Sequence, residues 1–155
     1  YPDLLDKLIV VDIAPKSYPV HHDHILDGLH DIDLNTLTSR TEADKLLSRQ
    51  VPEPDVRQFL LKNLARNSEG KFEWRVNIHA IDEHIEEIGA GMQYEGQFTG
   101  ETLFIKGVRS NYYTPGDEEN ILKIFPAAQF VTLNTGHWVQ AEDPKAFSET
   151  VLKFL

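Results

Sequence analysis

The sequence predicts an α/β fold, in which helices flank parallel strands. Three short runs, at residues 8–13, 102–106 and 129–133, are almost continuously apolar and rich in β-branched residues. Strands that are buried on both faces of a parallel sheet have this pattern. A segment with helical spacing lies between the second and third runs, and another follows the third. We therefore expect a β-α-β unit followed by a final helix.

The first run, LIVVDI, contains one carboxylate, Asp12. A strand this apolar is typical of the centre of a sheet, so we expect neighbours on both of its sides. The last helix, at residues 143–155, has Asp143 as its N-cap and Pro144 in its first position. Its apolar residues recur every four positions, which indicates that one face packs on the sheet.

Residues 17 to about 91 show helical patterns in place of strands. We expect three helices here: one capped by Thr41, one opened by Pro54, and one that carries the isoleucines at positions 78, 81, 85 and 88. An insertion between two strands leaves and returns at an edge of the sheet, and open parallel sheets bind ligands at their carboxyl edge. The segment is therefore predicted to form a helical cap over the carboxyl ends of the strands.

The composition limits the range of functions. At 155 residues with 41% hydrophobic content, the chain is long enough for one compact domain. Its 25 acidic and 15 basic residues give a formal net charge of -10 without a basic stripe, which argues against nucleic acid as a partner. There are no cysteines, which excludes disulfides, thiolate zinc sites and a cysteine nucleophile.

The sequence shows no membrane or export signal. No apolar run approaches the roughly 20 residues that a membrane span needs, and the first residues lack a signal-peptide pattern. We therefore expect no membrane span and a cytoplasmic location. Because the chain begins with Tyr1 and not with methionine, it is also expected to be a piece of a longer protein.

Two residues at the predicted carboxyl edge suit acid–base chemistry. His137 lies in the loop NTGHWVQAEDP directly after the last strand, where the preceding glycine gives the backbone room to turn. Asp12 stands near the end of the first strand, where an unpaired buried charge is costly. Since both lie at the same edge, we expect them to pair, with the carboxylate fixing the imidazole tautomer and the histidine acting as a general base.

The cluster His21-His22-Asp23-His24 invites a metal-binding interpretation. His21 and His24 are three positions apart, as ligands on one helix face are, but the sequence offers no third convergent ligand. We therefore predict no metal at this cluster, and nothing in the sequence implies a cofactor.

Several segments, taken in order, resemble a known family. They are YPDLLDKLIVVDIAP, FLLKNL, WRVN, TLFIKG followed by SNY, IFPAAQFVTL and GHWVQAEDPKAF. In this order they resemble the carboxyl-terminal part of an α/β-hydrolase, in the branch of the YbfF-like bacterial esterases. That branch is related to the mitochondrial abhydrolase-domain-11 proteins and to yeast ethanol acetyltransferases. The match runs nearly end to end and is strongest at residues 1–19 and 102–155.

The resemblance implies a catalytic triad in the chain order Ser, acid, His, with the serine in a Gly-x-Ser-x-Gly turn. None of the six serines of this chain has that context. The nucleophile, the oxyanion-hole loop and the first strands are therefore expected upstream of Tyr1, so that the missing amino-terminal half of the fold is a partner of these residues. The residues that match the other two triad positions are His137 and Asp12.

The resemblance leaves a choice among three candidates for the acid. Many α/β-hydrolases carry it in a Gly-x-x-Asp pattern after the strand that corresponds to TLFIKG, but here that pattern ends with Ser110, and Asp117 is the nearest downstream carboxylate. A second position lies just after WRVN, where related sequences can show an aspartate, and it reads Asn-Ile-His at residues 77–79. The YbfF-like branch places the acid in a DIAP-type motif, so we take Asp12.

By resemblance, the parent protein is expected to hydrolyse a small-molecule carboxylic ester through an acyl-enzyme. A cap rich in Leu, Ile and Phe indicates an apolar pocket for short or medium acyl chains. Trp138, Tyr112 and Trp74 are weaker candidates for substrate contacts, and each also suits a packing role. One alternative is an acyltransferase with the same triad, and another is a non-catalytic fragment that acts only by binding. We expect the isolated chain to aggregate or oligomerise.

Overall fold

The computed structural model describes the chain except for residues 1, 20–22 and 92–93. The chain divides into two compact units, and each is described by itself. The first comprises residues 1–16 and 91–155, and the second comprises residues 17–90. The role of the second unit as a helical cap stays a prediction.

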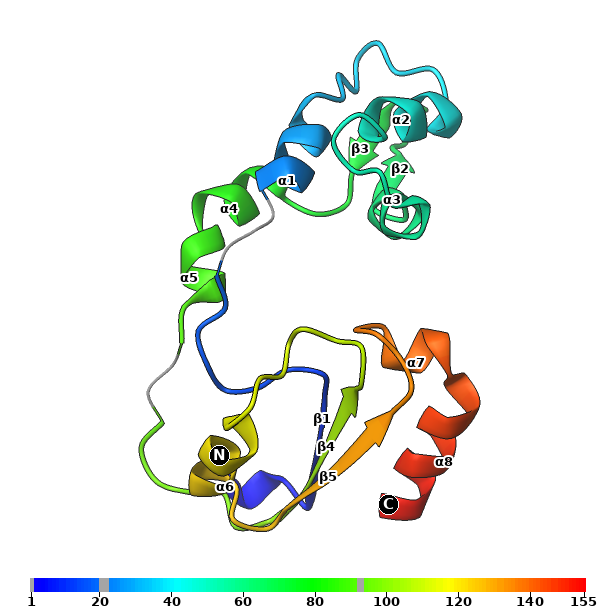
Figure 1. Cartoon of the computed structure of the whole chain (residues 1–155). Coiled ribbons are helices and arrows are strands. Elements are labelled where there is room, and N and C mark those ends of the chain that lie inside the picture. The colour runs from blue at the N-terminus through cyan, green and yellow to red at the C-terminus, as the bar shows by residue number, and fades with distance from the viewer. Residues whose placement is uncertain (1, 20–22, 92–93) are drawn as a thin grey trace. The chain divides into compact units, whose positions relative to one another are not determined.

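A three-stranded parallel sheet forms the centre of the first unit (Figure 1). Its strands are β1 (Lys7–Val11), β4 (Glu101–Gly107) and β5 (Ala128–Leu133), in the order β1-β4-β5. Both strand pairs are parallel, so the carboxyl ends of all three meet at one edge. The predicted α/β fold class is confirmed.

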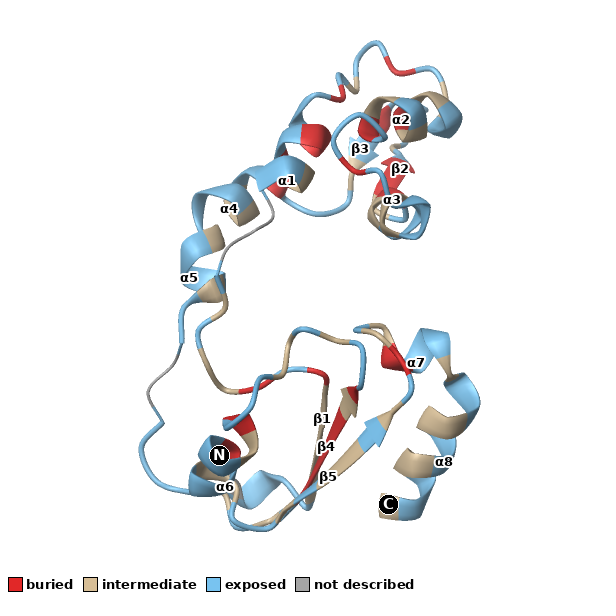
Figure 2. Ribbon diagram, viewed as in Figure 1, coloured by how far each residue is buried: buried red, intermediate tan, exposed pale blue. Residues whose placement is uncertain are grey.

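Helices cover both faces of this sheet. Since successive residues of a strand point to opposite sides, neighbouring residues of β4 pack against different helices. On one face, Phe104 of β4 packs with Ile121 of α6. On the other face, Leu103 and Ile105 pack with Val139 of α7 and with residues of α8. Figure 2 shows buried positions along β4 and in α6 and α7. The bounds of these helices are α6 (Asp117–Ile124), α7 (Val139–Glu142) and α8 (Pro144–Phe154).

The last helix begins as the sequence predicts. The Asp143 carboxylate accepts a hydrogen bond from the backbone N–H of Ala146 at 2.9 Å, and Pro144 occupies the first helical position. The sequence does not predict α7 or the 3-10 turn η1 (Pro2–Leu4), because so few residues give no periodicity to detect.

The first strand differs from expectation. Among the described residues β1 pairs only with β4, and all five of its residues are half-buried instead of buried. Its other edge therefore presents N–H and C=O groups that no described strand pairs with. The neighbour that the sequence predicts on that side does not lie within the described residues.

The second unit is more complex than the three helices that the sequence predicts. Its described residues form five helices and an antiparallel pair of strands, with a core that includes the fully buried Leu47, Val51 and Leu64. The elements are α1 (Asp23–His30), α2 (Arg40–Leu47), α3 (Pro54–Leu61), β2 (Leu64–Arg66), β3 (Phe72–Trp74), α4 (Ile78–Glu83) and α5 (Ile85–Gly89).

Two predicted helix boundaries in this unit are wrong. The N-cap of α2 is Ser39 and not Thr41, and the Ser39 hydroxyl accepts the backbone N–H of Glu42 at 3.1 Å. The isoleucine stripe does not form one helix, because the backbone at His84 (φ -116°, ψ 14°) separates α4 from α5. Across the described ranges of both units, no helix is long and apolar enough to cross a membrane.

Candidate active site

Asp12 follows β1 directly, in a backbone conformation that few residues adopt. Its φ is 50°, in the left-handed region, where aspartate is better tolerated than most residues other than glycine. Its N–H donates to the carbonyl of Ile105 at 2.8 Å, so pairing with β4 continues one residue past the strand. The strained residue is thus held in place by the sheet, as strained backbone at functional sites commonly is.

The Asp12 carboxylate is fully buried and accepts three hydrogen bonds. Its Oδ1 accepts the backbone N–H of Gly107 at 2.9 Å. Its Oδ2 accepts the Ser110 hydroxyl and lies 2.8 Å from Nδ1 of His137. These donors replace the water that a carboxylate loses on burial, which is the condition for keeping a charge inside a protein.

His137 reaches this carboxylate from the loop after β5. An ionised carboxylate only accepts hydrogen bonds, so Nδ1 carries the proton and Nε2 is the nitrogen that can accept one. The imidazole is 43% exposed, whereas its Asp12 partner is 0% exposed. The pair can therefore take a proton at Nε2 while the buried carboxylate stabilises the imidazolium that results.

Tyr112 lies flat on the imidazole of His137. The two ring centroids are 3.8 Å apart, and the ring planes differ by 11°. The backbone N–H of Tyr112 donates to the Ser110 oxygen at 3.2 Å, and Ser110 in turn donates to Asp12. Ser110 therefore ties the tyrosine and the carboxylate together.

Sequence reasoning did not assign Ser110 a place in the site, since a serine there cannot be the acid. The signal that could have found it is its position three residues past the carboxyl end of β4, the strand that pairs with β1. A hydroxyl at that position lies within reach of a carboxylate that follows β1.

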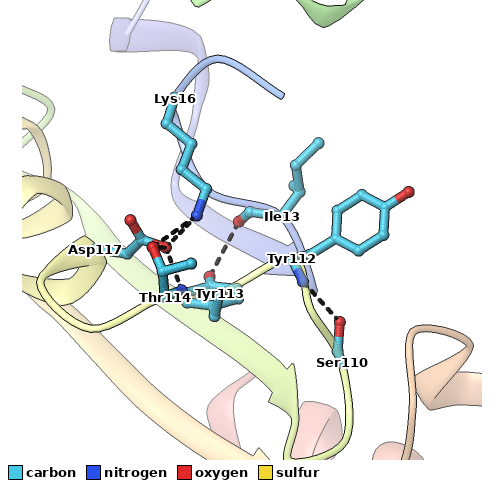
Figure 3. A network of polar contacts seen from close by, with 7 residues as sticks. All are labelled: Ile13, Lys16, Ser110, Tyr112, Tyr113, Thr114 and Asp117. Carbon is cyan, nitrogen blue, oxygen red and sulfur yellow. Dashed lines mark hydrogen bonds and ion pairs between the residues drawn. The ribbon is translucent and has the colours of Figure 1, made fainter. Parts of the chain in front are cut away.

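Asp117, the alternative acid, is engaged elsewhere (Figure 3). Its Oδ2 accepts hydrogen bonds from Nζ of Lys16 at 2.5 Å and from the backbone N–H of Thr114 at 2.6 Å. Burial raises the pKa of Asp117, but the hydrogen bonds from Lys16 and Thr114 outweigh it and hold the pKa below its usual value. In the same loop, the Tyr113 hydroxyl donates to the carbonyl of Ile13 at 3.0 Å. The carboxylate that contacts His137 is that of Asp12.

No model of a protein family matches the chain. Two curated proteins match it over nearly its whole length. It is 34% identical to the sn-1-specific diacylglycerol lipase ABHD11 of Mus musculus, over 99% of this chain and 52% of that protein. It is 31% identical to the esterase YbfF of Escherichia coli K12, over 99% of this chain and 59% of that protein.

Solved structures of hydrolases also match the chain. A marine microorganism esterase matches with a TM-score of 0.94 and 38% identity, over 99% of this chain and 62% of that one. A more distant match, E-2-(acetamidomethylene)succinate hydrolase, has a TM-score of 0.63 at 16% identity, over 99% of this chain and 59% of that one, and shows the fold alone. The chain is a relative of the α/β-hydrolase esterases. It spans between 52% and 62% of the length of these four proteins.

The two candidate tryptophans of the chain take no part in the Asp12–His137 contact. Trp138 precedes α7, and its carbonyl accepts the N–H groups of Ala141 and Glu142, both at 2.9 Å. Trp74 ends β3 in the second unit. Substrate contacts of Trp138, Tyr112 and Trp74 stay predictions.

The structure describes only part of the histidine cluster. His21 and His22 lie outside the described residues, and His24 lies in α1. Within the ranges that the structure describes, no three His, Cys, Asp or Glu side chains form a group that could hold a metal ion.

Proposed function

We propose that the protein to which this chain belongs hydrolyses carboxylic esters through an acyl-enzyme, and that this chain supplies His137 as the base and Asp12 as the acid. The observation that supports this most strongly is the 2.8 Å contact between His137 Nδ1 and a carboxylate with 0% exposure. A histidine in that state is oriented to accept a proton at Nε2. The names of the relatives, an esterase and a lipase, point to the same chemistry.

The nucleophile, in this proposal, is a serine outside the 155 residues. None of the six serines of the chain lies in a Gly-x-Ser-x-Gly turn. Ser110 contacts the pair, but its hydroxyl donates to the carboxylate of Asp12. A nucleophile must instead give its proton to Nε2 of the histidine, on the side away from the acid.

The proposed reaction uses two proton transfers at His137. Nε2 takes the proton of the serine hydroxyl as the oxygen attacks the ester carbonyl, and gives it to the leaving alcohol. Asp12 stabilises the imidazolium in between. Water then enters, loses its proton to the same nitrogen and releases the acid product from the acyl-enzyme.

We further propose that the substrate is a small ester with an apolar acyl group and that the second unit acts as a helical cap. The chain leaves the first unit after Lys16, five residues past the carboxyl end of β1. An insertion that departs there starts beside the edge at which open parallel sheets bind ligands.

The test is hydrolysis of p-nitrophenyl esters of increasing acyl length by the full-length protein. We expect His137→Ala to remove nearly all turnover and Asp12→Asn most of it, while Asp117→Asn has little effect. Turnover that survives His137→Ala, or that depends on Asp117 and not on Asp12, would contradict the proposal. Added ethanol separates hydrolysis from acyl transfer, because an acyltransferase would give an ethyl ester in place of the free acid.

A further inference from the structure

The loop that carries His137 lies in close contact with the end of β4. A Cβ atom on Gly107 would lie 2.2 Å from the carbonyl oxygen of Gly136 and 2.7 Å from that of Thr135, so only glycine allows this approach. The backbone N–H of Arg109 donates to the Thr135 carbonyl at 2.9 Å. The backbone of the loop is thus fixed against β4 on one side.

The Arg109 guanidinium holds the same loop through its side chain. Its Nη1 donates to the backbone carbonyl of Asn134 at 2.8 Å and to the side-chain oxygen of that residue at 2.6 Å. Its Nη2 donates to Oε2 of Glu142, at the end of α7, at 2.8 Å. A planar guanidinium with two donors engaged defines a direction as well as a distance.

Glu142 completes the contact with the residue next to the histidine. The oxygen that pairs with Arg109, Oε2, also accepts the backbone N–H of Gly136 at 2.9 Å. A Cβ atom on Gly136 would lie 2.8 Å from Oε1 of the same carboxylate. A methyl group at position 136 would therefore push this carboxylate away from the place that it occupies beside the loop.

We propose that Arg109 and Glu142, which we call the loop clamp, are positioning residues for His137 in the reaction proposed above, on which this inference rests. Exposed ion pairs contribute little to stability, and the side chains of Arg109 and Glu142 are 55% and 37% exposed. Yet together they bind three groups of the loop before the histidine: the backbone and side-chain oxygens of Asn134 and the backbone N–H of Gly136. Their effect is to keep Nε2 where a serine proton can reach it, and a displacement of about 1 Å can cost about 100-fold in rate.

The first test is the kinetics of Glu142→Ala in the full-length protein. We expect kcat to fall on the order of 10-fold to 100-fold, with KM within about twofold. The melting temperature should change by no more than about 3 °C, because the pair is exposed. The matched control is Glu69→Ala, which removes a similar exposed ion pair to Lys71 at 2.9 Å and should leave kcat unchanged.

Gly136→Ala tests the geometry without removing a charge. Its Cβ would lie 2.8 Å from Oε1 of Glu142, so the carboxylate must shift and its hydrogen bond to the Gly136 N–H weakens. We expect kcat to fall, by no more than in Glu142→Ala. The double variant should be no worse than Glu142→Ala alone, because the group that the new methyl displaces is already gone. Additive losses, or full activity in both single variants, would overturn the clamp.

A spectroscopic readout separates this inference from the proposed reaction. In full-length protein labelled with 15N-histidine, the Nδ1–H of His137 should give a downfield proton signal that His137→Ala removes. The signal should broaden or vanish in Glu142→Ala and persist in Glu69→Ala. Unchanged signals in Glu142→Ala would refute the clamp even in an active esterase. If Glu142→Ala loses the signal but His137→Ala keeps its activity, the loop clamp is supported and the proposed reaction is refuted.

Discussion

Replacing Asp12 by asparagine and by alanine separates its contribution to stability from its proposed chemical role. In Asp12→Ala, the buried N–H of Gly107 loses its acceptor, at a cost of about 1–3 kcal/mol. Alanine also tolerates the left-handed φ of 50° less well than aspartate, which adds about 1 kcal/mol. We expect the alanine variant to lose about 3 kcal/mol of unfolding free energy.

Asparagine keeps most of that stability but reverses the hydrogen bond to His137. The Gly107 N–H fixes the orientation of the new amide, because this donor must face the amide oxygen and not the NH2 group. The NH2 group then faces Nδ1 of His137, which must accept, so the imidazole proton moves to Nε2. We expect a stability loss of only about 1 kcal/mol but a loss of kcat on the order of 10⁴-fold, since Nε2 can no longer take a proton.

Urea unfolding of the full-length protein measures the stability of each variant, and turnover of an ester measures the function. The tautomer is read from the 15N shifts of the two imidazole nitrogens of His137. The reasoning is refuted if Asp12→Asn retains turnover within about tenfold of the original protein with Nδ1 still protonated. It is equally refuted if asparagine and alanine destabilise the fold to the same extent.

Three further predictions concern the stability of the two units. The pKa of Asp117 is held below its usual value, so the ionised carboxylate stabilises the fold. This contribution is complete above the unfolded pKa of about 4 and is lost as the pH falls through the lower folded pKa. In unfolding curves measured from neutral to acid pH, Asp117→Asn should therefore lose less stability on acidification than the original protein does. Gly107→Ala should destabilise the first unit by at least about 2 kcal/mol in urea unfolding, because its Cβ meets backbone oxygens that cannot rotate away. Leu47→Ala should cost about 2–5 kcal/mol by the same measurement, because Leu47 is 0% exposed in the core of the second unit.

The sequence is informative where one periodic signal dominates. The apolar runs predict the parallel strands, because a strand covered on both faces has no polar alternation. The start of α8 is predicted from Asp143 and Pro144, since an N-cap and a first-turn proline act locally. The β2–β3 pair is missed because two strands of three residues each are too short to show a period of two.

The site depends on contacts that no local pattern encodes. Proximity of Asp12 and His137 could be inferred from their places at one sheet edge, although they are 125 positions apart. The positive φ of Asp12 could not, because no residue pattern encodes the backbone conformation after β1. The contact from Ser110 could be inferred only from the pairing of β1 with β4, which brings the residues after these two strands close together. The catalytic roles of Asp12 and His137 stay predictions.

The most direct test of the central claim is the rate at which a fluorophosphonate labels the full-length protein. Such reagents react with a serine only when a base takes its proton, so labelling reports the proposed role of His137 without assuming a substrate. We predict stoichiometric labelling of one serine outside the 155 residues, with a rate that falls on the order of 10³-fold or more in His137→Ala. Labelling at an unchanged rate in a folded His137→Ala variant would contradict the account.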